Sequence, residues 1–310
     1  MNLYQKIFQG WQILKYGRRA DFVIITAITL IFLSIIALNV RLIFQMTSNQ
    51  TEEIGQMQLE SIRGDLQGAL AHAEGVTLQE AMEAEQLLNS GASLEELEKF
   101  FYQKKAEQKA LSGGICFNVY ITSKSWTIIP DFNFPEDYHA PERLWYKGAA
   151  ENPEKVYITE PYPDAAGNGI CFTMSKMLSD GETVVGLDFA LEDIQKSILQ
   201  MSTSSDRAAL IVTKSGLIIG YTDMSLVGEK ISKKLPEYGN ILARVLSMNR
   251  HESFTAQIDG REHTIFSSET KNGWYMLLSV DNNAFYRESY RQIIFTIALS
   301  FAMMFSIIFF

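Results

Sequence analysis

The sequence predicts an α+β protein in which a long N-terminal stalk helix and two five-stranded antiparallel sheet modules are flanked by two transmembrane helices. Three observations lead to this prediction. An uncharged apolar stretch lies near each end of the chain, the region 45–112 is proline-free and rich in helix-forming residues, and two successive sets of short strands follow it. This layout places the sheet modules on one side of a membrane and both chain ends on the other.

The two apolar stretches run from Phe22 to Val40 and from Ile293 to Phe310. A helix of about 20 apolar residues crosses the roughly 30 Å hydrocarbon core of a bilayer, so each stretch is predicted to span it. Basic residues favour the cytoplasmic side, and the first span is preceded by Lys6, Lys15, Arg18 and Arg19. The predicted segments are a cytoplasmic 1–21, a transmembrane helix 22–44, an extracytoplasmic 45–290 and a second transmembrane helix 291–310. Segment 1–21 has two possible interpretations, an interfacial helix on the inner leaflet and an unstructured tail.

Composition and charge narrow the possible functions. Six of the 27 basic residues and one of the 36 acidic residues lie outside 45–290, which leaves 21 basic and 35 acidic residues there and a net charge of −14. Such a surface repels phosphate backbones, which argues against nucleic-acid binding.

The cysteines and histidines say little in favour of a disulfide or a metal site. Cys116 and Cys171 are expected to be two buried thiols on strands, and a disulfide between them in the extracytoplasmic compartment is the alternative interpretation. The histidines and cysteines lack metal-ligand spacing, so no metal or other cofactor is expected.

Helix and strand signals divide the extracytoplasmic region into three parts. The stalk and its helices cover 45–112, with interruptions predicted at 75–77 and 89–93, where Ser93 and Glu96 have capping-box spacing. A membrane-distal module, 113–204, and a membrane-proximal module, 205–283, each follow the order two strands, helix, three strands. The distal elements are predicted at 115–121, 126–129, 142–150 (helix), 156–159, 170–177 and 183–190, with an exit helix at 191–201. The proximal elements are predicted at 208–212, 217–220, 236–248 (helix), 252–258, 262–267 and 274–279.

Three short strings in the distal module carry a family resemblance. They are Arg-Leu-Trp-Tyr-Lys-Gly-Ala at 143–149, Glu-Pro-Tyr-Pro-Asp at 160–164 and Val-Val-Gly-Leu-Asp at 184–188. Together with the layout, they resemble the double Cache sensor domains of bacterial transmembrane receptors over residues 20–310. The resemblance implies two PAS-like modules, a ligand site in the distal module, a two-pass location in the bacterial cell membrane, and a homodimer with its contact along the stalk.

A narrower resemblance is to the double Cache receptors that bind free amino acids. Those receptors carry a tyrosine, an R-x-W-Y string, a Y-x-D string and a further aspartate, which this chain matches with Tyr138, Arg143, Trp145, Tyr146, Tyr162, Asp164 and Asp188. An α-amino acid is a zwitterion, and the chemistry of the set agrees with one. A guanidinium holds a carboxylate through two parallel hydrogen bonds, and an ionised Asp188, or Asp164 as a second candidate, accepts from an ammonium. The aromatic rings supply the walls.

Each of these residues also has a purely structural interpretation. Arg143 can pin a loop through an ion pair, the Trp and Tyr side chains can be ordinary core, and Asp164 can cap a turn. Asp188 lies inside an apolar strand, where an unpaired carboxylate is costly. Its partner is therefore either a ligand ammonium or a structural hydrogen bond.

The sequence favours the ligand-sensing part of a transmembrane signal-transduction receptor that binds a free amino acid and transmits a helix shift. The chain stops inside the second span, and the resemblance implies a cytoplasmic output domain beyond it, with a histidine kinase favoured over a diguanylate cyclase or a chemoreceptor signalling rod. A sensor for an organic acid or amine and a non-catalytic protein-interaction or anchor ectodomain are the alternatives. An extracytoplasmic enzyme is disfavoured because no catalytic set stands out. The second module is expected to be a spacer without a ligand.

Overall fold

The computed structural model describes residues 3–112, 116–135, 138–167, 169–191, 206–248 and 253–309. Two compact units divide the chain: residues 1–54 together with 282–310, and residues 55–281. The first unit holds the predicted membrane helices, and the second holds both sheet modules. The predicted exit helix at 191–201 lies outside the described residues apart from its first position.

The helices of the first unit differ in how well they meet the requirements for a membrane span. α1 covers Leu3–Asn89 and α7 covers Asn282–Phe309. From Phe22 onward α1 is long and apolar enough to cross a membrane, with a mean hydropathy of 2.6 in its most apolar window. The apolar part of α7 among the described residues, Tyr290–Ser306, is shorter, so the second pass stays a prediction. The backbone is helical from Leu3, in agreement with a helix rather than an unstructured tail at the N-terminus.

The stalk folds back at one of the two predicted interruptions. α1 ends at Asn89, Gly91 adopts φ +81°, and α2 covers Leu94–Leu111. Glycine takes this left-handed conformation without the steric cost that other residues meet. Ser93 and Glu96 form the predicted capping box, in which each side chain accepts from the other residue's backbone N–H.

The interruption predicted at 75–77 is wrong, because α1 continues through it. A single glycine costs a helix only about 1 kcal/mol, which tertiary packing readily offsets. The packing is present here: Ala73 and Thr77 are buried, and the Thr77 hydroxyl donates to the Ala73 carbonyl at 2.9 Å.

The distal module is a twisted antiparallel sheet with a helix on one face. Its strands have the order β2-β1-β6-β5-β3, with β4 paired to β5 beside β3. The five predicted strands are confirmed, and the two-residue β4 is an addition that its length and its proline hide in the sequence. The two cysteines are buried free thiols. The bounds are β1 Cys116–Thr122, β2 Thr127–Ile128, a 3₁₀ turn Ala140–Glu142, α3 Leu144–Glu151, β3 Tyr157–Ile158, β4 Tyr162–Pro163, β5 Ile170–Met177 and β6 Val184–Ala190.

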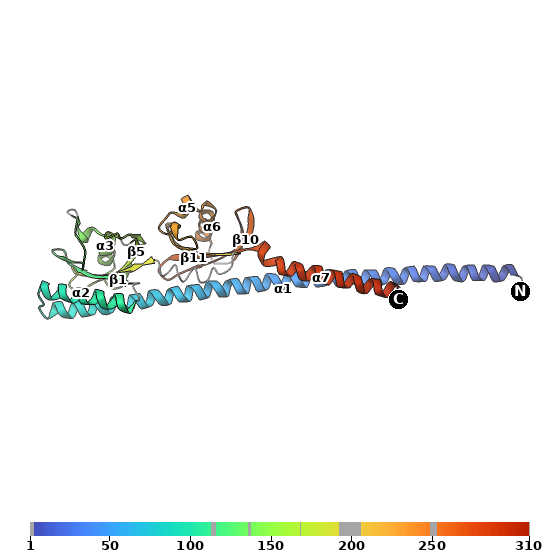
Figure 1. The fold of residues 1–310 in the computed structure, drawn as a ribbon, viewed down its shortest axis with the longest axis horizontal. Helices are drawn as coiled ribbons and strands as arrows, with labels where there is room; N and C mark the ends of the chain where they lie inside the picture. The colour runs from blue at the N-terminus through green and yellow to red at the C-terminus, as the bar shows by residue number, and fades with distance from the viewer. Residues whose placement is uncertain are drawn as a thin grey trace. The chain divides into compact units, whose positions relative to one another are not determined.

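The proximal module repeats this arrangement with a different sequence. Its strand order, β8-β7-β11-β10-β9, is the distal order again. Figure 1 shows the distal sheet between α2 and α3, and the proximal sheet between α1 and the α5–α6 segment. The PAS-like α+β fold predicted from the sequence is therefore confirmed for both modules. The bounds are β7 Arg207–Thr213, β8 Ile218–Tyr221, a 3₁₀ turn Met224–Leu226, α5 Ile231–Lys234, α6 Pro236–Ser247, β9 Phe254–Ile258, β10 Arg261–Glu269 and β11 Trp274–Asp281.

A buried ion cluster fastens α2 to α1. Glu80 of α1 is fully buried, and the Lys104 ammonium of α2 lies 3.3 Å from its carboxylate. Gln108 donates to the same carboxylate at 2.7 Å, and Lys104 also pairs with the more exposed Glu83. Burial raises the pKa of Glu80, against the lowering effects of Gln108 and Lys104. The Glu80 charge therefore depends on these two partners, which fix how α2 sits on α1.

Candidate functional site

Arg143 stands at the start of α3, where the chain leaves the 3₁₀ turn. It is the N-cap residue, with extended backbone angles of φ −72° and ψ 151°, so its side chain leaves the helix at its first turn. The guanidinium lies 5.6 Å from the ring centroid of Tyr138, in a cation–π contact. Within the described part of the chain no carboxylate forms an ion pair with Arg143. The guanidinium is thus held by an aromatic face while its hydrogen-bond donors are available to an anion.

Asp188 occupies β6, the central strand of the distal sheet, and is 5% exposed. Its Oδ1 accepts two hydrogen bonds, from the Tyr120 hydroxyl at 2.9 Å and the Thr173 hydroxyl at 2.6 Å. No described residue donates to Oδ2, and this atom is not among the fully enclosed unpaired ones. One oxygen of a buried carboxylate is therefore structurally satisfied, and the other is available to a ligand.

The electrostatics of Asp188 connect it to Arg143. Burial raises the pKa of the Asp188 carboxyl to about 7, against the lowering effect of its two hydroxyl donors. The charge of Asp164 raises this pKa further, and that of Arg143 lowers it. The guanidinium is therefore close enough to influence the carboxylate, yet the two groups form no ion pair. This separation is what a zwitterion placed between them requires.

A chain of hydroxyl groups extends the site to β4. The Tyr162 hydroxyl lies 2.5 Å from the Thr173 hydroxyl oxygen, which in turn donates to Asp188. Thr173 is fully buried, and burial raises the pKa of Tyr162 well above its ordinary value, so the phenol stays neutral. The sequence analysis did not single out Thr173 or Tyr120. The signal that could have found them is a hydroxyl-bearing residue at a buried strand position next to the Asp188 strand.

Aromatic rings from the loop before α3 form a wall beside these charges. Tyr138 packs edge-on against Phe132 and Phe134, with ring centroids 5.0 and 5.4 Å apart. Burial raises the pKa of Tyr138 to about 12, with smaller effects from the charges of Arg143, Asp188 and Asp164. The phenol of Tyr138 thus senses all three predicted charged residues. Five of the seven predicted residues influence one another electrostatically, namely Tyr138, Arg143, Tyr162, Asp164 and Asp188, and Tyr138 and Tyr162 also pack against the core cluster that contains Trp145 and Tyr146.

The other two predicted residues, Trp145 and Tyr146, lie in the core of the module. Trp145 is 2% exposed and packs edge-on against the Tyr120 ring, with centroids 5.0 Å apart. The Tyr146 hydroxyl donates to the backbone carbonyl of Glu182 at 2.7 Å, which ties α3 to the β5–β6 turn. Trp145 therefore supports the tyrosine that holds Asp188. The Tyr146 hydroxyl is thus used within the module, whereas no described residue accepts a hydrogen bond from the Trp145 indole N–H, which is also not among the fully enclosed unpaired atoms.

Among the described residues no group of three or more histidine, cysteine, aspartate or glutamate side chains could hold a metal ion. The chemistry of the site is that of a binding site: a guanidinium, a half-satisfied buried carboxylate, neutral phenols and aromatic faces. A two-module fold with such a site in one module, next to a helix suited to a membrane, has the organisation of a receptor's sensor region.

Comparisons with known proteins agree with this class. The structure is similar to the ligand-binding domain of the amino acid chemoreceptor PctB of Pseudomonas aeruginosa PAO1 in complex with L-Arg. The identity is 20%, the TM-score 0.59, and the match covers 77% of this chain and 98% of that chain. It is also similar to the ligand-binding domain of the Pseudomonas fluorescens chemoreceptor CtaA in complex with L-isoleucine, with 22% identity, a TM-score of 0.58, and 80% and 98% coverage. The chain thus has the double Cache fold.

The sequence also matches chemoreceptors directly. It is 28% identical over 154 residues to the methyl-accepting chemotaxis protein McpA of Bacillus subtilis (strain 168), which is 49% of this chain and 22% of that protein. The chain therefore spans about a fifth of the length of this relative. No family model matches the chain. The resemblance is to sensor domains and not to an enzyme, as the sequence analysis expects.

Proposed function

We propose that this chain is the sensory region of a bacterial chemoreceptor and that its distal module binds a free amino acid between Arg143 and Asp188. The observation that carries the proposal is the state of Asp188. Its carboxylate is 5% exposed, has two hydroxyl donors on one oxygen and none from the described residues on the other. A buried charge with spare acceptor capacity is costly without a partner, and a ligand ammonium is the partner that it suits.

The ligand's second charge would be met by Arg143. A guanidinium binds a carboxylate through two parallel hydrogen bonds, and this one has no competing carboxylate among the described residues. The faces of Tyr138 and Tyr162 would then enclose the ligand backbone, with Asp164 near its ammonium. The solved structures to which the chain is similar are of domains in complex with L-Arg and L-isoleucine, which supports the class of ligand.

The proposed output is that of a chemoreceptor. The sequence favoured a histidine kinase, but the relatives found are methyl-accepting chemotaxis proteins, so a chemotaxis signalling domain replaces it. We keep the predicted two-pass topology as part of the proposal, with 22–44 and 291–310 in the membrane, the N-terminus in the cytoplasm and 45–290 outside. The homodimer in contact along the stalk belongs to the proposal as well.

The signal has a direct path from the site to the second module. Phe172 precedes Thr173 on β5; its ring stacks on Phe189 at 5.4 Å and meets the Trp274 ring edge-on at 5.7 Å. Trp274 begins β11, which runs into α7. A shift of Thr173 on ligand binding would therefore press on the strand that leads to the second membrane helix. Such a ligand drives signalling only if it binds two states with different affinity.

The proposal is tested by calorimetric titration of the purified chain in lipid nanodiscs with the common L-amino acids. For each binder, the matching carboxylic acid and amine, each lacking one charge, are titrated too. We expect Arg143→Ala and Asp188→Asn to weaken amino-acid binding by about tenfold to a hundredfold, since each removes a charge-assisted hydrogen bond. Arg244→Ala is the matched control, because Arg244 has the same cation–π arrangement, 4.0 Å over Phe254, in the other module.

Three results would contradict the proposal. Binding of simple acids with the same affinity as amino acids would leave Asp188 without a role. Binding of simple amines alone would leave Arg143 without one. If the protein is folded and none of the amino acids gives a heat of binding, the anchor or protein-interaction alternative is favoured.

A further inference from the structure

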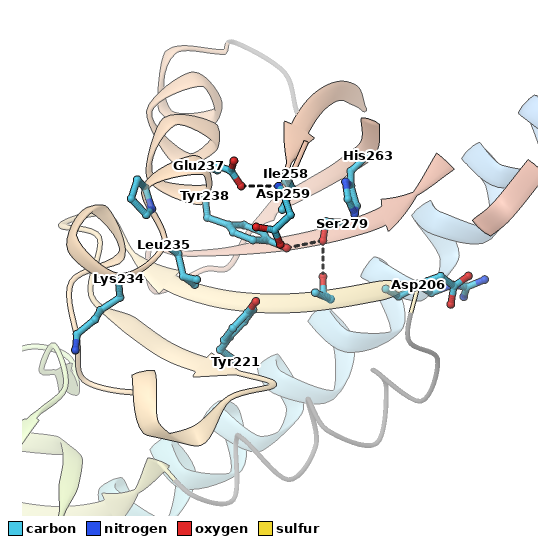
Figure 2. Close-up of a pocket in the computed structure, with 13 residues that line it drawn as sticks. Asp206, Tyr221, Lys234, Leu235, Glu237, Tyr238, Ile258, Asp259, His263 and Ser279 are labelled. Carbon is cyan, nitrogen blue, oxygen red and sulfur yellow. Dashed lines mark hydrogen bonds between the residues drawn. The ribbon is translucent and has the colours of Figure 1, made fainter. Parts of the chain in front are cut away.

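The proximal module contains a cavity of its own, with a volume of about 530 Å³. It opens between the sheet and the α5–α6 segment, and residues of β7, β8, β11 and the β9–β10 turn complete its lining, as Figure 2 shows. This volume lies within the range of small-molecule sites, which is about 300 to 1,000 Å³. From the sequence, this module is expected to be a spacer without a ligand. The residues that line its cavity differ from those of the distal site.

One polar residue of the cavity lies on the strand that corresponds to the Asp188 strand of the distal module. Ser279 lies on β11, the central strand, as Asp188 lies on β6. Ser279 is bonded to a tyrosine hydroxyl, that of Tyr238, at 2.7 Å, as Asp188 is bonded to Tyr120 at 2.9 Å. The carboxylate of the distal site is thus replaced here by a neutral hydroxyl, so the ligand charge must be met by other groups.

Two acidic side chains at the mouth provide that charge. Asp259 lies in the β9–β10 turn, and Glu237 lies in the first turn of α6, where it accepts the Asp259 backbone N–H at 2.9 Å. The charge of Asp259 helps to raise the pKa of both Tyr238 and Tyr221, so its carboxylate is close to both phenols. Figure 2 shows Asp259 beside the Tyr238 ring.

The basic residues of the lining leave this centre acidic. Lys234 points away from Tyr221 and Tyr238 in Figure 2 and pairs with Glu229, 3.8 Å away and outside the lining. Arg207 lies next to Asp206 in the chain at the start of β7, and its buried Nε has no hydrogen-bond partner among the described residues. His263 is the remaining basic residue, and its Nδ1 lies 3.2 Å from the Arg261 carbonyl oxygen.

Aromatic faces complete the arrangement. The rings of Tyr221 and Tyr238 meet edge-on, with centroids 6.1 Å apart and planes at 69°. Such a corner of electron-rich faces beside a carboxylate attracts an organic cation. The net charge of −14 on residues 45–290 concentrates cations near the surface and adds to this preference.

We propose that the proximal cavity is a second ligand site, which binds a small organic ammonium ion between Tyr221, Tyr238 and Asp259. The ammonium lies against the two tyrosine faces and donates to the Asp259 carboxylate. The site is independent of the amino-acid site in the distal module. Because β11 leads directly into α7, occupancy of this site acts on the same strand that the distal module reaches through Trp274.

The test uses the full chain in nanodiscs and calorimetric titration with n-butylammonium at millimolar concentrations. Butyrate and n-butanol, which have similar shape and the opposite charge or none, are titrated as controls. Asp259→Asn removes the charge and keeps the turn, because asparagine tolerates the left-handed backbone, φ +50°, that Asp259 adopts. Glu269→Gln is the matched control, an exposed carboxylate of the same module outside the cavity.

We expect n-butylammonium to bind and its affinity to fall by about tenfold or more in Asp259→Asn. The affinity should be unchanged in Glu269→Gln and in Asp188→Asn, which disables only the distal site. Tyr221→Leu, which removes one aromatic face and leaves the turn intact, should weaken binding several-fold. Three results overturn the proposal: no heat with the ammonium, preference for butyrate, or an affinity that falls in Asp188→Asn and not in Asp259→Asn. Asp188→Asn and Asp259→Asn each affect one site only. If the proximal proposal is refuted, the proposal of amino-acid binding in the distal module is therefore unaffected.

Discussion

Amino-acid binding should release a proton from Asp188. The burial that surrounds this carboxyl raises its pKa to about 7, so at about pH 6 roughly nine in ten copies are protonated. A ligand ammonium binds the ionised form, and binding at that pH therefore expels about 0.9 proton, against about 0.1 at pH 8. Because only the ionised fraction binds, the affinity should fall about tenfold between pH 8 and pH 6.

The groups around Asp188 should not obscure this effect. Burial raises the pKa of Tyr120, Tyr162 and Cys171 far above neutral and that of Tyr138 to about 12, so all four stay uncharged in this pH window. His139 is an exposed histidine next to Tyr138, so His139→Gln serves as the control and should leave the proton count unchanged.

The assay is titration calorimetry in two buffers of different ionisation enthalpy at the same pH. The change in apparent binding enthalpy between the buffers gives the number of protons released. A count near zero at about pH 6, or an affinity that is the same at pH 6 and pH 8, would refute the assignment of Asp188 as the partner of the ligand ammonium.

Three further substitutions test the packing that supports the site and the stalk. Thr173→Val keeps the side-chain shape but removes a donor to the buried carboxylate, which should cost about 1–3 kcal/mol of unfolding free energy and weaken amino-acid binding. Lys104→Met leaves the fully buried Glu80 without its counter-ion and should cost about 3–5 kcal/mol. Gly186→Ala places a methyl group against the Tyr120 ring, which should cost about 1–3 kcal/mol and displace the tyrosine from the site carboxylate. Chemical denaturation followed by circular dichroism measures all three.

The lysine and glycine substitutions each have a matched control. Lys105→Met removes a pair with the largely exposed Asp131 and should cost less than about 1 kcal/mol. Gly64→Ala adds a methyl group on α1 with no neighbour within 4 Å, and should stabilise the protein by about 0.5–1 kcal/mol. Equal losses from the two lysine variants, or from the two glycine variants, would show that the cluster and the Tyr120 packing do not have the importance assigned to them. If Thr173→Val leaves the free energy of unfolding unchanged, the hydroxyl chain does not have the importance assigned to it.

The sequence predicted what depends on local chemistry. The capping box at Ser93 and the two sets of strands follow from spacing and periodicity, and both are confirmed. Asp188 could be selected because a lone carboxylate in an apolar strand needs a partner. The interruption at Gly75 was wrong because packing along the helix, which the local sequence does not report, outweighs the cost of one glycine.

The register in which the strands pair could not be predicted from the sequence. Thr173 and Tyr120 become partners of Asp188 only because β5 and β1 pair with β6 on either side, at Thr173 opposite Asp188 and Tyr120 opposite Gly186. Gly186 leaves room for the Tyr120 ring, which a side chain there would fill. Aromatic residues such as Trp145 could equally be core or wall by composition. Their neighbours decide between these roles, and such neighbours come from distant parts of the chain.

The most direct test of the central claim is a crystal structure of the sensor region with an amino acid that binds in the calorimetric screen. We expect the ligand carboxylate on the Arg143 guanidinium and the ammonium within hydrogen-bond distance of Oδ2 of Asp188, with Oδ1 still bonded to Tyr120 and Thr173. A ligand found elsewhere, or one whose ammonium faces away from a protonated Asp188, would contradict it.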